Sequence, residues 1–415
     1  MQGTDEQDRT LCRDDADAFI AEATAFLEAN AERRPGSDAP AAWGEGPQVS
    51  LMGGADPDAE DQRLADARVW RAKVFDAGFA WLSGPVAYGG GGRHPDLDQV
   101  YRTLEAGFDV PDQSAWAVAW EMVAPAVLVH GSEALKQRYL RRIMRGELLC
   151  SQLLSEPENG SDLAGLRTRA VRDGDEWVVN GQKVWSSYAH KADIGQLMAR
   201  TDPHVPKHQG ITMFLLPMDT PGVDPRPLRQ MNGNAEFNEV FLTDVRVPDA
   251  NRVGEAGNGW RAVLTTLMSE RVAVGSGKSS SALDPSVMVT ELARHAARQT
   301  DPVVRQSLAT IYTNRRLLEW LAARTSEAVA AGRPLGPEGS IMKLLANHQN
   351  RAIGNLAGSL LGPSMAADTG DWGTYAWANF LCSAPGLRIA GGTDEIQHNI
   401  LGERVLGLPR EPQHG

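Results

Sequence analysis

The sequence predicts an α+β protein in which a helical region, an antiparallel β region and a second helical region follow one another along the chain. Apolar residues recur every three or four positions before about Arg145 and again after Asn258. Between Gln152 and Arg252 the apolar period shortens toward two, with proline and glycine at the breaks. We therefore expect an N-terminal α-helical domain at residues 1–150, a middle β domain at residues 151–254 and a C-terminal four-helix bundle at residues 255–415.

The N-terminal region carries helical apolar patterns at 15–34 and 63–82. A third apolar stretch, 115–129, contains Glu121 and Pro125. It is too short and too interrupted to span a bilayer, so we expect a buried helix there and no membrane span.

Two dipeptides in the β region, Asp173-Gly174 and Asn180-Gly181, predict tight hairpin turns because these residue types tolerate positive φ. Such turns would place the segments 154–162 (LSEPENGSD) and 181–187 (GQKVWSS) beside neighbouring strands of one small sheet. The region shows no alternation of strands and helices, so a Rossmann nucleotide-binding fold is not expected.

The C-terminal region predicts long helices joined by short loops. One helix should begin with Asp301 as N-cap and Pro302 at its first position, and end near Gly332. A second should cover about 338–361, and a third should begin after Thr393, whose hydroxyl can cap it. This arrangement predicts an antiparallel four-helix bundle.

The composition argues against several classes of function. Acidic residues outnumber basic ones by 53 to 41, for a formal net charge of −12 at pH 7, which does not favour binding to nucleic acid or to anionic membranes. Cys12, Cys150 and Cys382 have neither zinc-binding nor disulfide spacing, so we expect no metal site and a reducing compartment. The acidic, polar N-terminus predicts no signal peptide, and we expect a cytoplasmic location.

The segments 154–162 and 181–187 carry side chains that suit a planar, polar heterocycle. The first offers hydroxyls and flexible backbone N–H groups, while Trp185 offers a flat face and Ser186 and Ser187 offer further donors. Taken singly, each segment is equally typical of an ordinary strand with a half-buried tryptophan, followed by a Ser-Asp turn.

Two adjacent charges, Glu270 and Arg271, fall on the apolar stripe of a predicted helix that passes through Val263 and Leu267. Their position indicates a candidate functional carboxylate. From the residues alone, a structural ion pair or a stripe that turns toward solvent explains them better.

Taken together, these motifs resemble the acyl-CoA dehydrogenase family. The similarity runs from Ala124 to near the C-terminus, through segments such as FNEVFLTDVRVPDANRVGE and GGTDEIQHNILGERVLGLP, over roughly 290 of 415 residues. The resemblance implies an FAD-dependent enzyme that oxidises a fatty acyl-CoA thioester to the trans-2-enoyl-CoA. A carboxylate removes the α-proton, the β-hydrogen leaves as hydride to flavin N5, and an electron-transfer flavoprotein accepts the electrons.

The family places its catalytic carboxylate at one of two positions, either in the C-terminal motif or just before an arginine on the first bundle helix. In this chain the C-terminal position is Gly391, which has no side chain to act as a base. Glu270, followed by Arg271, matches the second arrangement, found in isovaleryl- and long-chain-type enzymes. The resemblance thus implies that Glu270 is the base, that Arg271 orients it and contacts the substrate, and that the N–H of Gly391 polarises the thioester carbonyl.

The resemblance also implies which residues contact the cofactor. Ser155 and Ser187 stand where relatives often have threonine, and they keep the hydroxyl donor. Ser161 matches a serine near both the flavin and the CoA chain, and Gln152 stands where some relatives have an aromatic residue. The implied cofactor-binding residues are Gln152, Leu154, Ser155, Gly160, Ser161, Trp185, Ser187, Gly392 and Thr393.

One part of the family pattern is missing. Many homotetrameric relatives carry Arg-x-x-Phe-Gly after the first bundle helix, and that arginine holds the FAD pyrophosphate of a neighbouring subunit. Segment 287–306 contains no such motif, and SLLGP at 359–363 replaces a Gln-x-x-Gly-Gly segment that usually helps to bind the adenine end. In this respect the chain resembles actinobacterial members, some of which act on steroid side chains as heterotetramers of two different chains.

Three functions therefore stay open, with a homo- or hetero-oligomer (dimer or tetramer) in each. The first is an FAD-dependent acyl-CoA dehydrogenase that uses Glu270 as its base. The second is a subunit that completes a partner's FAD site. The third is a flavin monooxygenase or oxidase on the same scaffold, which the Glu270-Arg271 pair does not favour because oxygen chemistry needs no α-proton base.

Overall fold

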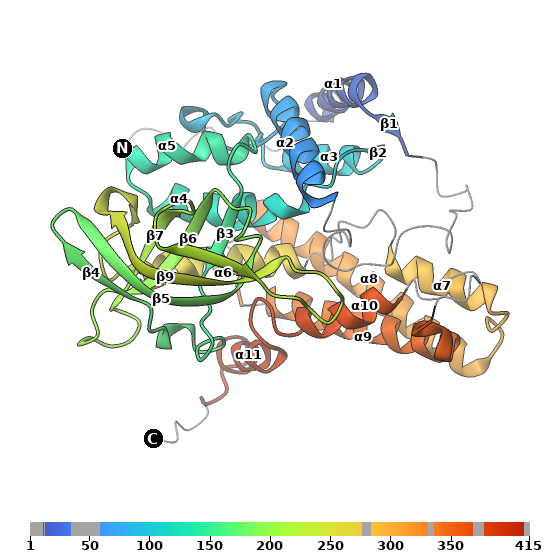
Figure 1. The fold of residues 1–415 in the computed structure, drawn as a ribbon. Helices are drawn as coiled ribbons and strands as arrows, with labels where there is room; N and C mark the ends of the chain where they lie inside the picture. Colours follow the sequence, from blue (N-terminus) through green and yellow to red (C-terminus); the bar gives the residue numbers. More distant parts are fainter. Residues whose placement is uncertain are drawn as a thin grey trace. The chain divides into compact units, whose positions relative to one another are not determined.

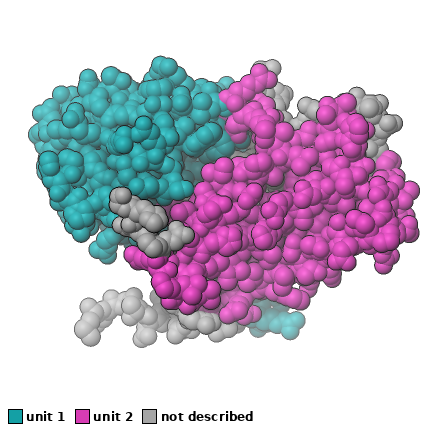
Figure 2. All heavy atoms as spheres, turned by 90° about the horizontal axis from the view of Figure 1, so that it is seen from below, with its two compact units in different colours: residues 1–39, 58–228, 236–266 teal, residues 40–57, 229–235, 267–415 magenta. Residues whose placement is uncertain are grey.

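The computed structural model describes residues 11, 13–34, 59–275, 284–330, 336–337, 339–367 and 377–410, and leaves out the side chains of 269–275, 326, 329 and 330. The chain divides into two compact units, coloured separately in Figure 2. Unit 1 comprises Met1–Ala39, Asp58–Leu228 and Glu236–Thr266, and unit 2 comprises Pro40–Pro57, Arg229–Ala235 and Leu267–Gly415. One boundary between the units falls within a helix, between Thr266 and Leu267.

Unit 1 begins with helices, as the spacing of apolar residues predicted. They are α1 (Arg13–Asn30), α2 (Glu60–Asp76), α3 (Asp96–Glu105), α4 (Ala124–His130) and α5 (Glu133–Met144), with a two-stranded ribbon of β1 (Glu32–Arg33) and β2 (Phe108–Asp109) (Figure 1). Aromatic rings join these helices. Phe79 packs against Phe26 of α1 and Tyr101 of α3, with ring centroids 4.9 and 5.5 Å away.

The stretch 115–129 is helical but not one regular helix. A π-helical turn covers Val118–Val123 and leads directly into α4. Pro125 lies in the first turn of α4, next to the π-helical turn where the helical hydrogen-bond pattern is already irregular. No helix in the described ranges is long and apolar enough to cross a membrane.

The rest of unit 1 is a mainly antiparallel eight-stranded sheet. Its strands are β3 (Cys150–Leu153), β4 (Arg169–Asp173), β5 (Glu176–Ser187), β6 (Ile194–Arg200), β7 (Ile211–Pro217), β8 (Val223–Pro227), β9 (Phe237–Pro248) and β10 (Arg252–Val253), in the order β10-β7-β6-β4-β5-β9-β8, with β3 beside β6. The β3–β6 and β4–β6 pairs are parallel, and the others are antiparallel. One face of the sheet packs a core that includes Trp177, Val179, Leu197, Phe214 and Val240.

Of the two predicted hairpin turns, one is confirmed and one is wrong. Gly174, with φ +65°, follows Asp173 in the tight connection between β4 and β5. Asn180-Gly181 instead lies inside β5, where the pairing with β9 shifts register. The side-chain amide of Asn180 exchanges hydrogen bonds with the Oδ1 and backbone N–H of Asp244 on β9 (3.0 and 2.9 Å). Asn180 faces two residues of β9, Thr243 and Asp244, so the dipeptide lies in a strand opposite a β-bulge of β9 and forms no turn.

The strand neighbours also differ from the prediction. The segment 154–162 follows β3, which pairs with β6, so β3 and β5 are not hydrogen-bonded neighbours in the sheet. The two motif segments nevertheless meet, because the backbone N–H of Val184 donates to the carbonyl of Ser155 (2.9 Å).

Unit 2 is helical, with the predicted helix starts confirmed. Its elements are the second half of α6 (Gly259–Gly275), α7 (Pro285–His295), α8 (Pro302–Ala330), α9 (Gly339–Leu361), α10 (Ala378–Leu387) and α11 (Asp394–Ile400) (Figure 1). Asp301 Oδ1 accepts the N–H of Val303 (2.8 Å), and Thr393 Oγ1 accepts the N–H of Ile396 (3.2 Å). α9 packs against α7, α8, α10 and α11, around a core that includes Val289, Leu292, Ile353, Leu356, Trp377 and Phe380.

We predict that Gly181→Ala destabilises unit 1 by about 1–3 kcal/mol, because a Cβ there would lie 2.4 Å from Thr168 Oγ1 and 2.7 Å from Thr168 Cα. Gly174→Asn is the matched control, since no atom lies within 4 Å of a Cβ at that position and asparagine tolerates positive φ. Thermal unfolding of both variants measures the difference. Equal midpoints would contradict the close-approach explanation.

Candidate active site

The loop of residues 154–162, here the 154–162 loop, begins where β3 ends. Leu154 is buried and Ser155 is half-buried. Glu156 and Asn159 exchange two backbone hydrogen bonds (3.1 and 3.0 Å), which turn the chain back on itself. Gly160 and Ser161 follow this turn and are exposed.

Residues 183–187, here the 183–187 bulge, interrupt the pairing of β5 with β9. The register shifts between Lys183 and Ser186, and Trp185 between them has φ +62°. The indole of Trp185 is 60% exposed and meets the ring of Phe237 edge-on, with centroids 6.2 Å apart. A non-glycine residue in this conformation costs about 1–3 kcal/mol, and such strain is typical of functional sites.

Several polar groups along these two segments have no partner within the described part of the chain. The side-chain hydroxyls of Ser155 and Ser187 make no hydrogen bond there, and Nε2 of Gln152 is buried without an acceptor. Open donors beside an exposed indole are the chemistry that a planar ring with polar edges requires. The residues present therefore fit the flavin ring that the resemblance implies.

In unit 2, the Gly391-Gly392 turn is held by side chains that bind its carbonyl oxygens. Both glycines have positive φ, +65° and +91°. The fully buried Lys343 of α9 donates through Nζ to the carbonyls of Ala390 and Gly392. Gln397 Nε2 donates to the carbonyl of Gly391 (2.9 Å). The φ of +91° at Gly392 is strained for any residue with a Cβ, so the turn favours glycine there.

The start of α11 is fixed by a second set of contacts. Asp394 accepts from Arg388 Nε and Asn347 Nδ2, both at 2.7 Å. Burial opposes ionisation of this carboxyl, but Arg388 and Asn347 outweigh it and hold the pKa of Asp394 below its ordinary value. The N–H of Gly391 donates to no backbone carbonyl among the described residues. It is therefore a candidate donor to a ligand.

Glu270 and Arg271 belong to α6, which continues to Gly275. Their side chains lie outside the described residues, so the role of Glu270 stays a prediction. Upstream on the same helix, Val263 and Thr266 are fully buried. Val263 is thus buried as the apolar stripe predicted, whereas Leu267 of the same stripe is only half-buried.

The structure brings together the sequence-predicted residues of unit 1. The 154–162 loop meets the 183–187 bulge, and Gln152 lies just before the loop on β3. In unit 2, Gly391, Gly392 and Thr393 share one turn, whereas Glu270 and Arg271 lie on a different element, α6.

Two buried lysines, Lys183 and Lys343, were not anticipated, although each supports a predicted loop. A signal for Lys183 exists in the sequence. Trp177, Val179 and Lys183 share the alternating phase of β5 that faces the core, and a lysine in that phase requires a buried partner.

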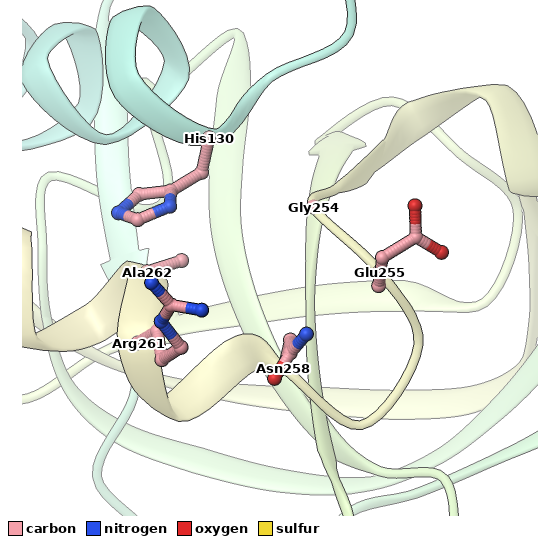
Figure 3. Close-up of a pocket in the computed structure, with 6 residues that line it drawn as sticks. All are labelled: His130, Gly254, Glu255, Asn258, Arg261 and Ala262. Atoms are coloured by element: carbon pink, nitrogen blue, oxygen red, sulfur yellow. The ribbon is translucent and has the colours of Figure 1, made fainter.

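A small polar pocket in unit 1 lies at the start of α6, lined by His130, Gly254, Glu255, Asn258, Arg261 and Ala262 (Figure 3). The His130 ring and the Arg261 guanidinium point toward one another, and His130 Nε2 contacts Thr265 Oγ1 (2.8 Å). Burial and then Arg261 lower the pKa of His130. The cavity volume of about 120 Å³ is below the range of about 300–1,000 Å³ typical of small-molecule sites, so it does not hold a substrate-sized ligand.

Family models match most of the chain. They describe the N-terminal, middle and C-terminal domains of acyl-CoA dehydrogenases, over residues 55–147, 151–245 and 257–406. The chain belongs to the acyl-CoA dehydrogenase family. Acyl-CoA dehydrogenases are flavoproteins that oxidise acyl-CoA thioesters, and the chain is an enzyme of this class.

Similar proteins confirm the actinobacterial resemblance. The acyl-CoA dehydrogenase IpdE1 of Mycobacterium tuberculosis (strain ATCC 25618 / H37Rv) is 36% identical over 364 residues, which cover 88% of this chain and 93% of that protein. Among solved structures, the ChsE4–ChsE5 complex from Mycobacterium tuberculosis matches with a TM-score of 0.72 and 29% identity, and the Tcur3481–Tcur3483 steroid ACAD with 0.74 and 25%. Each match covers 97% of this chain and 100% of the matched chain.

We predict that Lys343→Met loosens the Gly391-Gly392 turn, because the carbonyls of Ala390 and Gly392 lose their charged donor, and a hydrogen bond to a charged group contributes about 1.5–3 kcal/mol. Amide hydrogen exchange over residues 388–394 should accelerate. Lys191→Met, which removes a lysine from an exposed pair with Asp61, is the control and should leave exchange in that segment unchanged. Unchanged exchange in Lys343→Met would contradict the role given to Lys343.

Proposed function

We propose that this chain binds FAD and catalyses the α,β-dehydrogenation of an acyl-CoA thioester to the trans-2-enoyl-CoA. The observation that carries the proposal is Trp185, which is held outward in a left-handed conformation beside the open hydroxyls of Ser155 and Ser187. If Trp185 had only a structural role, nothing would explain why an exposed tryptophan is held in a strained backbone conformation. A ring that stacks on the indole and accepts hydrogen bonds at its edge gives one.

Within unit 1, the residues that would hold FAD lie along the two segments described above. Ser155 and Ser187 would donate to the ring edge, Trp185 would cover its face, and Leu154 would contact it through backbone atoms. Gln152, Gly160, Ser161, Gly392 and Thr393 complete the proposed cofactor set. When bound, FAD supplies a hydride acceptor for the β-hydrogen of the substrate.

The chain's own residues would carry out the proton chemistry. Glu270 would take the proton from the substrate Cα, with Arg271 orienting the carboxylate. The N–H of Gly391 would donate to the thioester oxygen, where negative charge develops as that proton leaves. The occupied carbonyls of the Gly391-Gly392 turn support this assignment, because they hold the peptide in one orientation. We further assign an electron-transfer flavoprotein as electron acceptor, and Ser161 and Arg271 as substrate contacts.

We predict that Glu270→Gln slows anaerobic bleaching of the bound flavin by an acyl-CoA by about 100- to 10,000-fold, because the amide keeps the shape of the base but cannot take the α-proton. Stopped-flow absorbance of the flavin measures the rate. Glu319→Gln, at an exposed carboxylate of α8, is the control and should bleach at the wild-type rate. Wild-type bleaching in Glu270→Gln would contradict the assignment of the base.

A second candidate function is a subunit of a heteromeric dehydrogenase whose FAD is shared with a different chain. Two observations favour it. Segment 287–306 lacks the pyrophosphate-binding arginine motif, and two of the similar structures are named as pairs of different proteins. In such an assembly the partner would supply the groups that hold the pyrophosphate and adenine of FAD.

We predict for this heteromer that the chain expressed alone in a foreign host purifies with little flavin, while a tagged copy from its own host brings down a second acyl-CoA dehydrogenase-like chain together with FAD. Flavin absorbance per chain and the mass of the assembly measure both points. One full FAD per chain in the protein expressed alone would contradict the heteromer and support a homo-oligomeric dehydrogenase.

A further inference from the structure

Lys183 joins the 183–187 bulge to the 154–162 loop through two side-chain hydrogen bonds. Its ammonium group is fully buried and donates to the carbonyl of Leu154 (3.0 Å) and to Oε1 of Glu156 (2.8 Å). Both acceptors belong to the loop. Together with the backbone bond from Val184 to Ser155, these contacts form one connected set between the two segments.

The carboxylate of Glu156 extends this set to the start of β4. Its Oε1 also accepts the N–H of Thr168 (2.8 Å), and its Oε2 accepts the N–H of Arg167 (2.6 Å). Burial works against the charge of Glu156, but Lys183 and these donors outweigh it, so the pKa of Glu156 lies below its ordinary value. Burial lowers the pKa of Lys183 to about 8, although Glu156 opposes this shift.

Such a pair is an inefficient way to stabilise a fold. Removing two charges from water costs several kcal/mol per ion, and apolar side chains of similar volume often serve a core equally well. The pair does, however, act on specific atoms. It fixes the carbonyl that precedes Ser155 and the strand position two residues before Trp185.

We propose that the Lys183–Glu156 pair is a positioning element that sets the mutual placement of Ser155 and Trp185, and through it the affinity of the chain for FAD. The inference rests on the proposed function. Neither residue is given contact with the cofactor: both act through the loop and the bulge that they join.

The test replaces both charges at once, in Lys183→Met combined with Glu156→Gln. These side chains keep the volumes of the originals, leave no unpaired buried charge and remove the bond to the Leu154 carbonyl. The matched control is Asp249→Ala, which removes an ion pair to Arg252 and a bond from Trp177 Nε1 (2.8 Å) at the opposite end of β5. A merely structural role predicts that the two proteins bind FAD equally well when their unfolding midpoints are equal.

Two readouts decide the question, one of them independent of flavin. The dissociation constant for FAD should rise about tenfold or more in the double variant and stay at the wild-type value in Asp249→Ala. In the FAD-free proteins, amide hydrogen exchange should accelerate across both 154–162 and 183–187 in the double variant only. Wild-type FAD affinity with wild-type exchange in the double variant would overturn the proposal.

Two further outcomes stay informative. If the double variant does not fold, Glu156→Asp is tested by the same two measurements, because it keeps both charges but draws the carboxylate away from Lys183. Weaker FAD binding with faster amide exchange supports the proposal. No change in either measurement overturns it. A wild-type chain that binds no FAD under any condition contradicts the proposed function, and the exchange comparison then decides the positioning role by itself.

Discussion

The bulge in β5 between Lys183 and Ser186 is the constraint on which the unit 1 site depends. Before the bulge, Trp177, Val179 and Lys183 of β5 face the core, while Gly181 between them is exposed. After it, Val184 and Ser186 are buried and Trp185 is exposed. Strict alternation would have buried the indole. One irregularity thus turns a core position into an exposed aromatic surface, at the expense of a left-handed conformation at Trp185.

Each unit stabilises one loop that carries candidate residues, and both use a buried lysine to do so. In unit 1 the buried Lys183 donates to the carbonyl of Leu154, and in unit 2 the buried Lys343 donates to the carbonyls of Ala390 and Gly392. A lysine has three donors on a flexible stem, so it can reach loop carbonyls that no secondary structure satisfies. Occupied carbonyls fix the peptide planes and leave the opposite N–H groups free for a ligand. The loops are therefore ordered by buried charge, in places where neither helix nor sheet could order them.

The parts of the fold that depend on near neighbours in the sequence could be predicted. Asp301 and Thr393 begin their helices as expected, because a cap bonds to an N–H two or three residues away. Asn180-Gly181 misled the prediction because the dipeptide, which suits a turn, also fits in a strand opposite a bulge of β9. What chose between them was the bond of Asn180 to Asp244, 64 residues away. The residues that would bind the FAD pyrophosphate could not be predicted either, because the usual arginine motif is missing from segment 287–306.

By itself the sequence determined the fold class, the family and the residue types of the candidate site, because apolar periodicity, capping and motif spacing act over short stretches of chain. It placed Ser155, Trp185, Ser187 and Gly391 among the candidates but said nothing of how they are held. Only the tertiary structure decided that Trp185 faces outward and that Lys183 pairs with Glu156, 27 residues earlier in the chain. The physical reason is that a buried charge must find a partner, and the packing of the 154–162 loop against β5, not sequence proximity, brings the two together.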